Sequence, residues 1–424
     1  MQITKLQYFL GAEMVSGELN AAAAGISNRW WIVVAAILSL IVGQGSINVF
    51  AAGVFLKPVA HELGFGRGAI STAIGVSSVV TALALPFFGR LVDRYGVRPM
   101  LLASITLFAL ATAAMSQFSA STTLLFLLFA LSGLVAVGQC PTAYSKVITQ
   151  WFDRQRGLAL GLALAGVGLG TALIPQLSNA LVGAFGWRMG YVGLGITIFV
   201  LAFVPVALFV REPPSRGPEQ HAQATRIGVT FSEASVTWPY WAMTLTFFFA
   251  ATTVNGTLIH VVPLLTDRGI APAAAAGALS AAGVALIGGR IVAGYLLDKI
   301  FAPYIAIFFL LCPMAGIAVL GSGALGSWPV IGTILLGLGI GGEIDLLSYI
   351  ISRYFGIHFF ATLHGFIFAV VLIGNAIGAS ILGWFFQLTH SYTMGFTVFE
   401  ILLAAACGLM LTLGPYRYPA FSGH

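Results

Sequence analysis

The sequence reads Gly89-Arg90-Leu91-Val92-Asp93-Arg94-Tyr95-Gly96-Val97-Arg98 between two long apolar runs, residues 69–88 and 100–115. Only a short turn fits between two membrane-spanning helices that follow each other so closely. The arginines of this turn outnumber its single aspartate, and basic turns tend to stay on the cytoplasmic side of a membrane. The stretch therefore predicts a polytopic membrane protein with this turn in the cytoplasm.

The same pattern occurs again in the second half of the chain. Residues 294–299 read Gly-Tyr-Leu-Leu-Asp-Lys and also end an apolar run. Asp298 follows Asp93 by 205 residues, and Gly294 follows Gly89 by the same interval. A repeat of this length predicts a chain built from two related halves.

Composition indicates the same class of protein. Of the 424 residues, 59% are hydrophobic and only 8% are charged, whereas soluble domains carry about 25% charged residues. A transmembrane helix needs ~20 apolar residues. We therefore expect an all-α membrane protein with twelve transmembrane helices in two pseudo-symmetric six-helix bundles. The expected helices cover residues 30–55, 69–88, 99–117, 122–147, 157–183, 188–210, 238–264, 272–297, 303–322, 328–352, 360–386 and 391–414.

Charges between these runs set the expected topology. With both termini in the cytoplasm, fourteen lysines and arginines fall on the cytoplasmic side and four outside, as the positive-inside rule requires. No cleavable signal peptide is evident, and we expect a multi-pass protein of the cell (inner) membrane. Basic residues confined to short turns do not suggest a nucleic-acid partner. The expected segments are a cytoplasmic tail (1–28), a first bundle (29–210), a cytoplasmic linker (211–237), a second bundle (238–415) and a second cytoplasmic tail (416–424).

One charge lies inside an apolar run. Arg290 follows Val284-Ala285-Leu286-Ile287-Gly288-Gly289 in the sequence, and an arginine at the bilayer centre costs about 3 kcal/mol on insertion scales. A guanidinium in a wet cavity can bind a carboxylate through two parallel hydrogen bonds. The alternatives are a permanent ion pair with an acid of the 328–352 helix, or a position near the cytoplasmic end from which the side chain reaches water.

Two acids in the 328–352 helix are candidates for proton coupling. Glu343 and Asp345 are two residues apart, a spacing that points them to roughly opposite sides of a helix. A buried carboxyl group without a partner tends to hold its proton near neutral pH. A structural hydrogen bond or ion pair within the bundle is the alternative for each. His260 is a third candidate, for proton or anion binding, and it can equally be a hydrated histidine near the membrane surface.

Other polar residues in the spans are candidates for lining a substrate cavity. Gln44 and Asn48 are four residues apart and share a helical face. Polar residues can equally join helices by hydrogen bonds. The full set of candidate substrate-binding residues is Arg290, Asn48, Gln44, Gln139, Tyr144, Asn255, His260 and Tyr349.

The chain shows no nucleotide-binding loop, nucleophile triad or metal-ligand spacing. Its three cysteines lie inside apolar runs and form no disulfide framework. Glycines follow small-xxx-small spacing at Gly157 and Gly161 and again at Gly374 and Gly378, which lets helices approach and slide. We therefore expect neither an enzyme nor a protein with a cofactor or metal.

The pattern G-x-x-x-D-R-x-G-x-R at 89–98 resembles the signature loop between the second and third helices of the major facilitator superfamily of transporters. This resemblance extends over roughly residues 29–415 and implies the major facilitator fold. It also implies a cytoplasmic gate near the inner end of the 360–386 helix, formed from Gly89, Asp93, Arg94, Gly96, Arg98 and Asp298.

Within that superfamily the chain resembles the monocarboxylate porters and the related oxalate/formate exchangers. The stretch 151–166 looks like an aromatic-Phe, basic, L-A-x-G-x-A-x-A-G pattern of the porters. Arg290, four residues before Gly294, matches their substrate arginine. The resemblance implies a small organic anion as substrate. The chain departs from it at Leu286, where animal members carry an aspartate, and in the 360–386 helix, which lacks the exchangers' lysine.

These departures mean that the family's proton route cannot be transferred, and a single intramembrane cation favours a monocarboxylate over a dicarboxylate. We expect a monomeric secondary transporter that moves a monocarboxylate with a proton by alternating access. An organic-anion exchanger is the main alternative, which counterflow without pH dependence would favour. Drug efflux is another, favoured if a variant at Arg290 still transports. A substrate receptor would bind its ligand without moving it.

Overall fold

The computed structural model describes residues 29–64, 67–119, 121–211 and 228–418. The expected tail at 1–28, most of the linker and residues 419–424 lie outside the described part. Within these ranges every regular element is a helix, apart from one isolated β-bridge between Gly228 and Gly356.

The first half begins with a helix whose last residues form a π-helical turn. Its elements are the span Arg29–Ala51 with η1 (Ser46–Ala51), α2 (Ala52–Leu63), α3 (Arg67–Tyr95), α4 (Val97–Ala114), η2 (Met115–Gln117), α5 (Thr122–Val135), η3 (Ala136–Gln139), α6 (Pro141–Trp151), α7 (Arg156–Ile198), η4 (Phe199–Phe203) and α8 (Val204–Phe209).

The second half begins, after the linker, with a short helix. Its elements are α10 (Phe231–Ser235), α11 (Trp238–Asp267), α12 (Pro272–Leu297), α13 (Ala302–Gly321), α14 (Trp328–Tyr354), α15 (Phe360–Thr389) and α16 (Thr393–Leu411).

Eleven helical stretches of the described residues are long and apolar enough to span a membrane. One of them, Arg156–Phe209, has 54 residues, or about 81 Å of helix against a hydrocarbon core of ~30 Å. Gly186 interrupts it with φ +78° and ψ 166°, a conformation that residues with a side chain rarely adopt. The stretch therefore crosses twice, and ten single crossings plus two give the expected twelve.

Two helices of the first half are interrupted at adjacent points. The first span loses its regular helix at Gly43, and η3 separates α5 from α6. A Cβ on Gly43 would lie 2.9 Å from the Leu40 carbonyl oxygen and 3.2 Å from that of Gln139. Irregular backbone at membrane depth is tolerated where protein covers it or where it lines a cavity. The sequence predicted both helices as continuous, and this was wrong at these two points.

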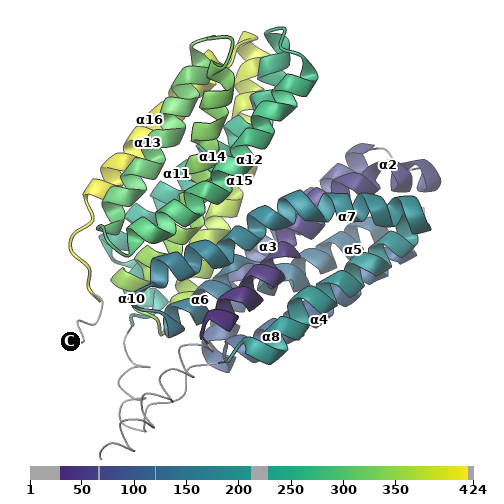
Figure 1. The fold of residues 1–424 in the computed structure, drawn as a ribbon, viewed down its shortest axis with the longest axis horizontal. Helices are drawn as coiled ribbons and strands as arrows, with labels where there is room; N and C mark the ends of the chain where they lie inside the picture. Colours follow the sequence, from purple (N-terminus) through teal and green to yellow (C-terminus); the bar gives the residue numbers. More distant parts are fainter. Residues whose placement is uncertain (1–28, 65–66, 120, 212–227, 419–424) are drawn as a thin grey trace, which may run out of the picture.

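The helices form two bundles, α2–α8 and α11–α16, as Figure 1 shows. The bundles meet at the end where α6, α8 and α10 lie, here called the linker side, and diverge toward the opposite end, the far side. Contacts between the bundles are made mainly by α3 with α15 and by α7 with α12.

Glycines allow these helices to touch backbone to backbone on the linker side. A Cβ on Gly89 of α3 would lie 2.2 Å from the Ala361 carbonyl oxygen of α15, and one on Gly157 of α7 would lie 2.3 Å from that of Gly294. Both approaches are closer than any Cβ could tolerate, so side chains at these positions would push the two bundles apart.

Candidate functional site

Arg290 lies deep in the second bundle. Its side chain is 2% exposed, and Nη1 is 3.7 Å from Oδ1 of Asp345 on α14, whose side chain is fully buried. This distance allows an ion pair but is too long for a hydrogen bond. Nε and Nη1 of Arg290 and both carboxylate oxygens of Asp345 have no hydrogen-bond partner among the described residues. The pair is therefore loose, with unused donors on the cation and unused acceptors on the acid.

Glu343 belongs to the same buried group. Its residue is 7% exposed, and Oε1 also lacks a hydrogen-bond partner in the described part of the chain. Glu343 and Asp345 are two residues apart on α14, a spacing that points the side chains to roughly opposite sides of the helix. The structure therefore buries all three predicted residues in the second bundle and pairs Arg290 with Asp345.

Charge balance gives this group its chemistry. One cation and two ionised carboxylates would leave a net negative charge in an apolar interior, which is costly. A proton on either acid removes that excess. A bound carboxylate ligand would restore that excess unless the other acid also took up a proton. The arrangement can therefore hold an organic anion and a proton together.

The candidates of the first bundle divide into satisfied and unsatisfied groups. The Asn48 amide donates to Ser77 Oγ (3.0 Å) and accepts from Ser132 Oγ (2.9 Å), which ties three spans together. The Tyr144 hydroxyl lies 2.5 Å from Ser39 Oγ and donates to Gln139 Oε1 (3.4 Å). Nε2 of Gln139 is buried without a partner among the described residues. Of this set, Gln139 offers an unused donor, whereas Asn48 acts as a joint between helices.

The other candidates lie apart or in less defined surroundings. Gln44 and Asn255 are half-buried. Nδ1 of His260 lies 3.4 Å from the Tyr392 hydroxyl, close to the start of α16. The Tyr349 ring lies under the Arg353 guanidinium, 5.1 Å from its centroid. His260 and Tyr349 therefore have neighbours other than the Arg290 group.

Two acids at the ends of α3 and α12 bind the first turns of helices in the opposite bundle. Asp93 accepts from the backbone amides of Thr362 (2.7 Å) and Ala361 (3.2 Å). Asp298 accepts from the amides of Gly157 (2.8 Å) and Leu158 (3.0 Å). A carboxylate is favoured at a helix N-terminus because the free amides and the helix dipole both attract it. The two halves of the chain thus repeat one contact, and the acids cross-link the bundles.

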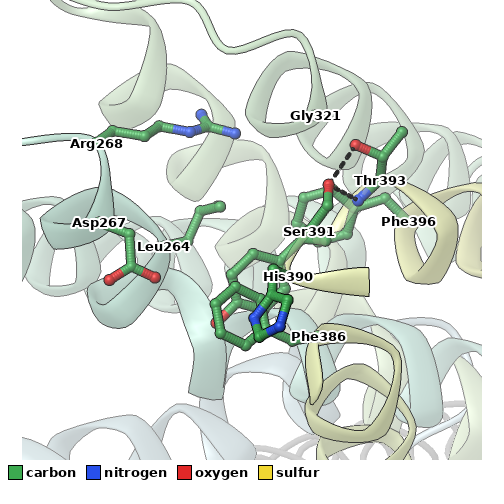
Figure 2. A pocket seen from close by; sticks show the side chains of 10 residues that line it. Leu264, Asp267, Arg268, Gly321, Phe386, His390, Ser391, Thr393 and Phe396 are labelled. Atoms are coloured by element: carbon green, nitrogen blue, oxygen red, sulfur yellow. Dashed lines mark hydrogen bonds between the residues drawn. The ribbon is translucent and has the colours of Figure 1, made fainter. Parts of the chain in front are cut away.

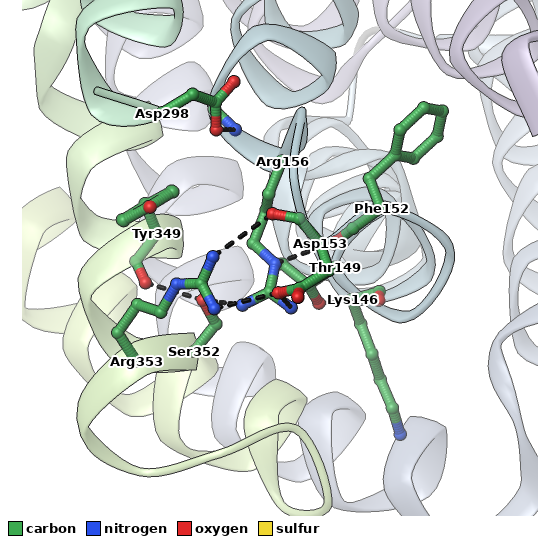
Figure 3. Close-up of polar contacts among 10 residues, drawn as sticks. Lys146, Thr149, Phe152, Asp153, Arg156, Asp298, Tyr349, Ser352 and Arg353 are labelled. Atoms are coloured by element: carbon green, nitrogen blue, oxygen red, sulfur yellow. Dashed lines mark hydrogen bonds and ion pairs between the residues drawn. The ribbon is translucent and has the colours of Figure 1, made fainter. Parts of the chain in front are cut away.

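Further charges join this linker-side cluster, and the sequence did not single them out. Lys146 of α6 donates to Asp93 Oδ1 at 2.7 Å, and both side chains are buried. Figure 3 shows Arg353 of α14 and Arg156 of α7 converging on Asp153, with ion-pair distances of 2.9 and 3.2 Å. Nη1 of Arg156 also donates to Ser352 Oγ of the opposite bundle (3.0 Å). They were missed because each looks like an ordinary turn residue in sequence.

The remaining residues of the expected gate have different surroundings. Nη2 of Arg98 donates to the Ala207 carbonyl (2.7 Å) inside the first bundle. The Arg94 guanidinium lies 5.3 Å from the centroid of its neighbour Tyr95. Gly96 has φ +90°, so it provides the sharp turn. Among the predicted gate residues of this loop, Asp93 and Gly89 contact the opposite bundle.

His364 of α15 lies fully buried between the bundles. Ser348 Oγ donates to Ser145 Oγ (2.9 Å) and so accepts from His364 Nε2 (3.1 Å). Nδ1 of His364 is then left to accept from Thr142 Oγ1 (3.0 Å). Neutral imidazole offers one donor and one acceptor, which matches this arrangement. The histidine therefore joins α6 of one bundle to α14 and α15 of the other.

Comparison with known proteins agrees with this architecture. The chain is 30% identical over 227 residues to the oxalate:formate antiporter of Oxalobacter formigenes, covering 53% of this chain and 52% of that protein. It is 24% identical over 392 residues to monocarboxylate transporter 13 of Bos taurus, covering 91% and 89%. The structure of the proton:xylose symporter XylE superposes with a TM-score of 0.74 at 13% identity, covering 93% and 97%.

The family model that matches the chain describes the Major Facilitator Superfamily and covers residues 38–379. This range includes the signature turn, its repeat and the buried Arg290 group. The members of this family are transporters rather than enzymes. The chain therefore belongs to the Major Facilitator Superfamily, as a multi-pass membrane transporter.

Proposed function

We propose that this transporter moves a small monocarboxylate together with a proton. The observation that supports this is the loose buried pair of Arg290 and Asp345, whose donors and acceptors have no hydrogen-bond partners among the described residues. A permanent structural ion pair would be expected to close to hydrogen-bond distance, because burial without those bonds is costly. Relatives named as monocarboxylate transporters and as an oxalate:formate antiporter support an organic anion as substrate.

The proposed mechanism exchanges partners at Arg290. A proton that reaches Asp345 neutralises the acid and frees the guanidinium, and the substrate carboxylate then binds the unused donors in its place. Release reverses this order, since loss of the proton restores Asp345 as a competitor for the cation. Glu343 is the second acid that can carry the proton. The anion and the proton are coupled because each makes the other's binding less costly.

The proposed transport cycle rocks the bundle 29–210 against the bundle 238–415 around this group. The contacts of Asp93, Asp298 and Asp153 close the linker side, while the bundles diverge on the far side (Figure 1). We assign the linker side, and both termini, to the cytoplasmic side of a cell membrane. The state described here is then closed to the cytoplasm. A monomer is sufficient for this cycle.

Variants at Arg290 and Asp345 test the proposal. A screen of monocarboxylates by thermal shift should find acids that stabilise the wild type, and Arg290→Ala should weaken their binding roughly tenfold to a hundredfold. Lys299→Gln, which removes an exposed cation nine residues further along the chain, just after α12 and its C-cap Asp298, is the matched control. In proteoliposomes, Asp345→Asn should retain counterflow but lose accumulation driven by a pH gradient. An Arg290→Ala variant that responds like the wild type would refute the anion assignment.

An organic-anion exchanger is the second candidate, favoured by the 30% identity to the oxalate:formate antiporter. An exchanger needs counterflow but no proton. The same experiment separates the two, since wild-type uptake that ignores the pH gradient while counterflow proceeds would favour exchange.

A further inference from the structure

A cavity lies at the far side of the second bundle. It encloses about 180 Å³ between the far ends of α11, α13 and α15 and the start of α16 (Figure 2). Arg290 lies 18 residues further along α12 than the far-side start of that helix at Pro272, or roughly 27 Å of helix. The cavity is therefore separate from the Arg290 group. All the elements that line it belong to one bundle.

Arg268 supplies the charge of this cavity. Its Nη2 donates to the Leu320 carbonyl (2.7 Å), which fixes the guanidinium, whereas Nη1 is buried with no partner among the described residues. Figure 2 shows the guanidinium extending past Leu264 toward the Ser391–Thr393 side of the cavity. Burial lowers the pKa of Arg268, as expected for a cation that has lost water and gained no anion. Arg268 thus lines a space that can hold an acceptor, and its guanidinium keeps one unused donor beside that space.

The opposite wall adds neutral donors. Ser391 Oγ and Thr393 Oγ1 lie 2.9 Å apart, and Ser391 Oγ also accepts from the Thr393 amide (3.2 Å). One of the two hydroxyl hydrogens makes their shared bond, which leaves the other available. His390 follows α15 with φ +52°, which is rare for a residue with a side chain. This turn places its ring in the lining.

Asp267 restricts what the cavity can hold. Asp267 also lines the space, and the ion pairs of the described residues do not include one between Asp267 and Arg268. The Asp267 charge repels a dianion about twice as strongly as a monoanion, so of the two the cavity accepts a singly charged ligand more readily. The cavity lies at the ends of membrane-spanning helices, where phospholipid headgroups reside. A tetrahedral oxyanion would accept hydrogen bonds from Arg268 and from a hydroxyl at once.

We propose that this cavity binds a singly charged phosphate oxyanion through Arg268 and the Ser391–Thr393 pair. The phosphodiester of a lipid headgroup and free monobasic phosphate share this chemistry. Since the lining elements belong to one bundle, occupancy stabilises that bundle and does not require movement between the halves.

Thermal-shift titrations of purified protein in a phosphate-free sugar detergent test this site. The probes are inorganic phosphate at pH 6 and dioctanoyl phosphatidylglycerol, each compared with chloride at equal ionic strength. Wild type should gain about 1–3 °C at saturation, and Arg268→Gln should lose that gain. Arg417→Gln, which removes an exposed cation of the C-terminal segment, is the control and should respond like wild type.

The outcomes separate the sources of the ligand. A gain with lipid alone assigns a headgroup, and a gain with phosphate alone assigns the free ion. If Arg268→Gln does not fold, Thr393→Val should still weaken the response several-fold. No gain with either probe, or an equal gain in wild type, Arg268→Gln and Thr393→Val, would overturn the proposal. Arg290→Ala should keep the full gain, so this test stands apart from that of the transport substrate.

Discussion

The contribution of Glu62 to stability can be measured through its dependence on pH. It accepts from Trp187 Nε1 (2.5 Å) and from Arg188 Nη2 (3.1 Å), and so holds α2 against the turn at Gly186. The hydrogen bond from Trp187 lowers the pKa of Glu62 most, followed by that from Arg188. A lowered carboxyl pKa stabilises the fold above the ordinary value of 4.5 and loses that effect as pH falls through the lower folded value.

We therefore expect Glu62→Gln to lower the melting temperature at pH 7 and to reduce its fall between pH 6 and pH 3.5. Melting curves of both proteins over this range measure the effect. Glu233→Gln is a second variant with which Glu62→Gln can be compared. The pKa of Glu233 is also lowered, chiefly by the hydrogen bond from the backbone amide of Thr230. Parallel curves for wild type and Glu62→Gln would show that Glu62 contributes nothing to the acid sensitivity.

Single residues differ in how far sequence reveals them. Arg290 was predictable because a charge inside an apolar run has few physical explanations. His364 was not, since its partners are a threonine 222 positions away and a serine 16 positions away. Neither partner is unusual by itself. A buried polar group defined by tertiary contacts leaves no local pattern to read.

Glycines decide how closely the helices α7 and α12 approach each other. A Cβ on Gly161 would lie 2.6 Å from the Arg290 carbonyl oxygen, so Gly161→Ala must push the two helices apart. We expect this to cost about 1–3 kcal/mol in the state closed on the linker side. Gly183→Ala in the same α7 meets nothing within 4 Å and should be neutral or stabilising by up to ~1 kcal/mol.

The rate of a cysteine cross-link between the bundles measures how far Gly161→Ala opens the linker side. Ser145 and Ser348 lie on opposite bundles with their hydroxyls 2.9 Å apart, so cysteines there should form a disulfide in the closed state. With the three native cysteines replaced, Gly161→Ala should slow this cross-link and Gly183→Ala should not. Equal rates in both variants would mean that the Gly161 contact does not hold the linker side closed.

The ends of helices also differ in whether the local sequence or a tertiary contact determines them. The division of the Arg156–Phe209 stretch was predictable, because its length exceeds one crossing and Gly186 lies inside it. The interruptions at Gly43 and at η3 were not predicted. Pro141, which begins α6, was a local signal for the second break. The first depends on the close approach of Gly43 to Gln139, which no local pattern records.

The linker side of the protein is held by two related contacts of unequal strength. Asp93 accepts from two backbone amides and from Lys146 and Thr362, whereas within the described part of the chain Asp298 accepts from two backbone amides alone. Burial raises the pKa of Asp298, so this contact tolerates a neutral side chain better. Asp93→Asn also leaves Lys146 buried without its carboxylate, which costs several kcal/mol in such pairs.

We therefore expect Asp93→Asn to open the linker side more than Asp298→Asn does, by about 2–3 kcal/mol in the closing equilibrium. The rate of the Ser145→Cys and Ser348→Cys cross-link reports this, together with transport measured from each side. Lys146→Met combined with Asp93→Asn should recover part of the loss, because the double change removes the stranded cation. If Asp298→Asn opened the gate as far as Asp93→Asn, or if Lys146→Met gave no recovery, the Lys146 pair would not be the stronger latch. The two halves of the chain would then close the molecule with equal contacts, as their repeated sequence alone suggests.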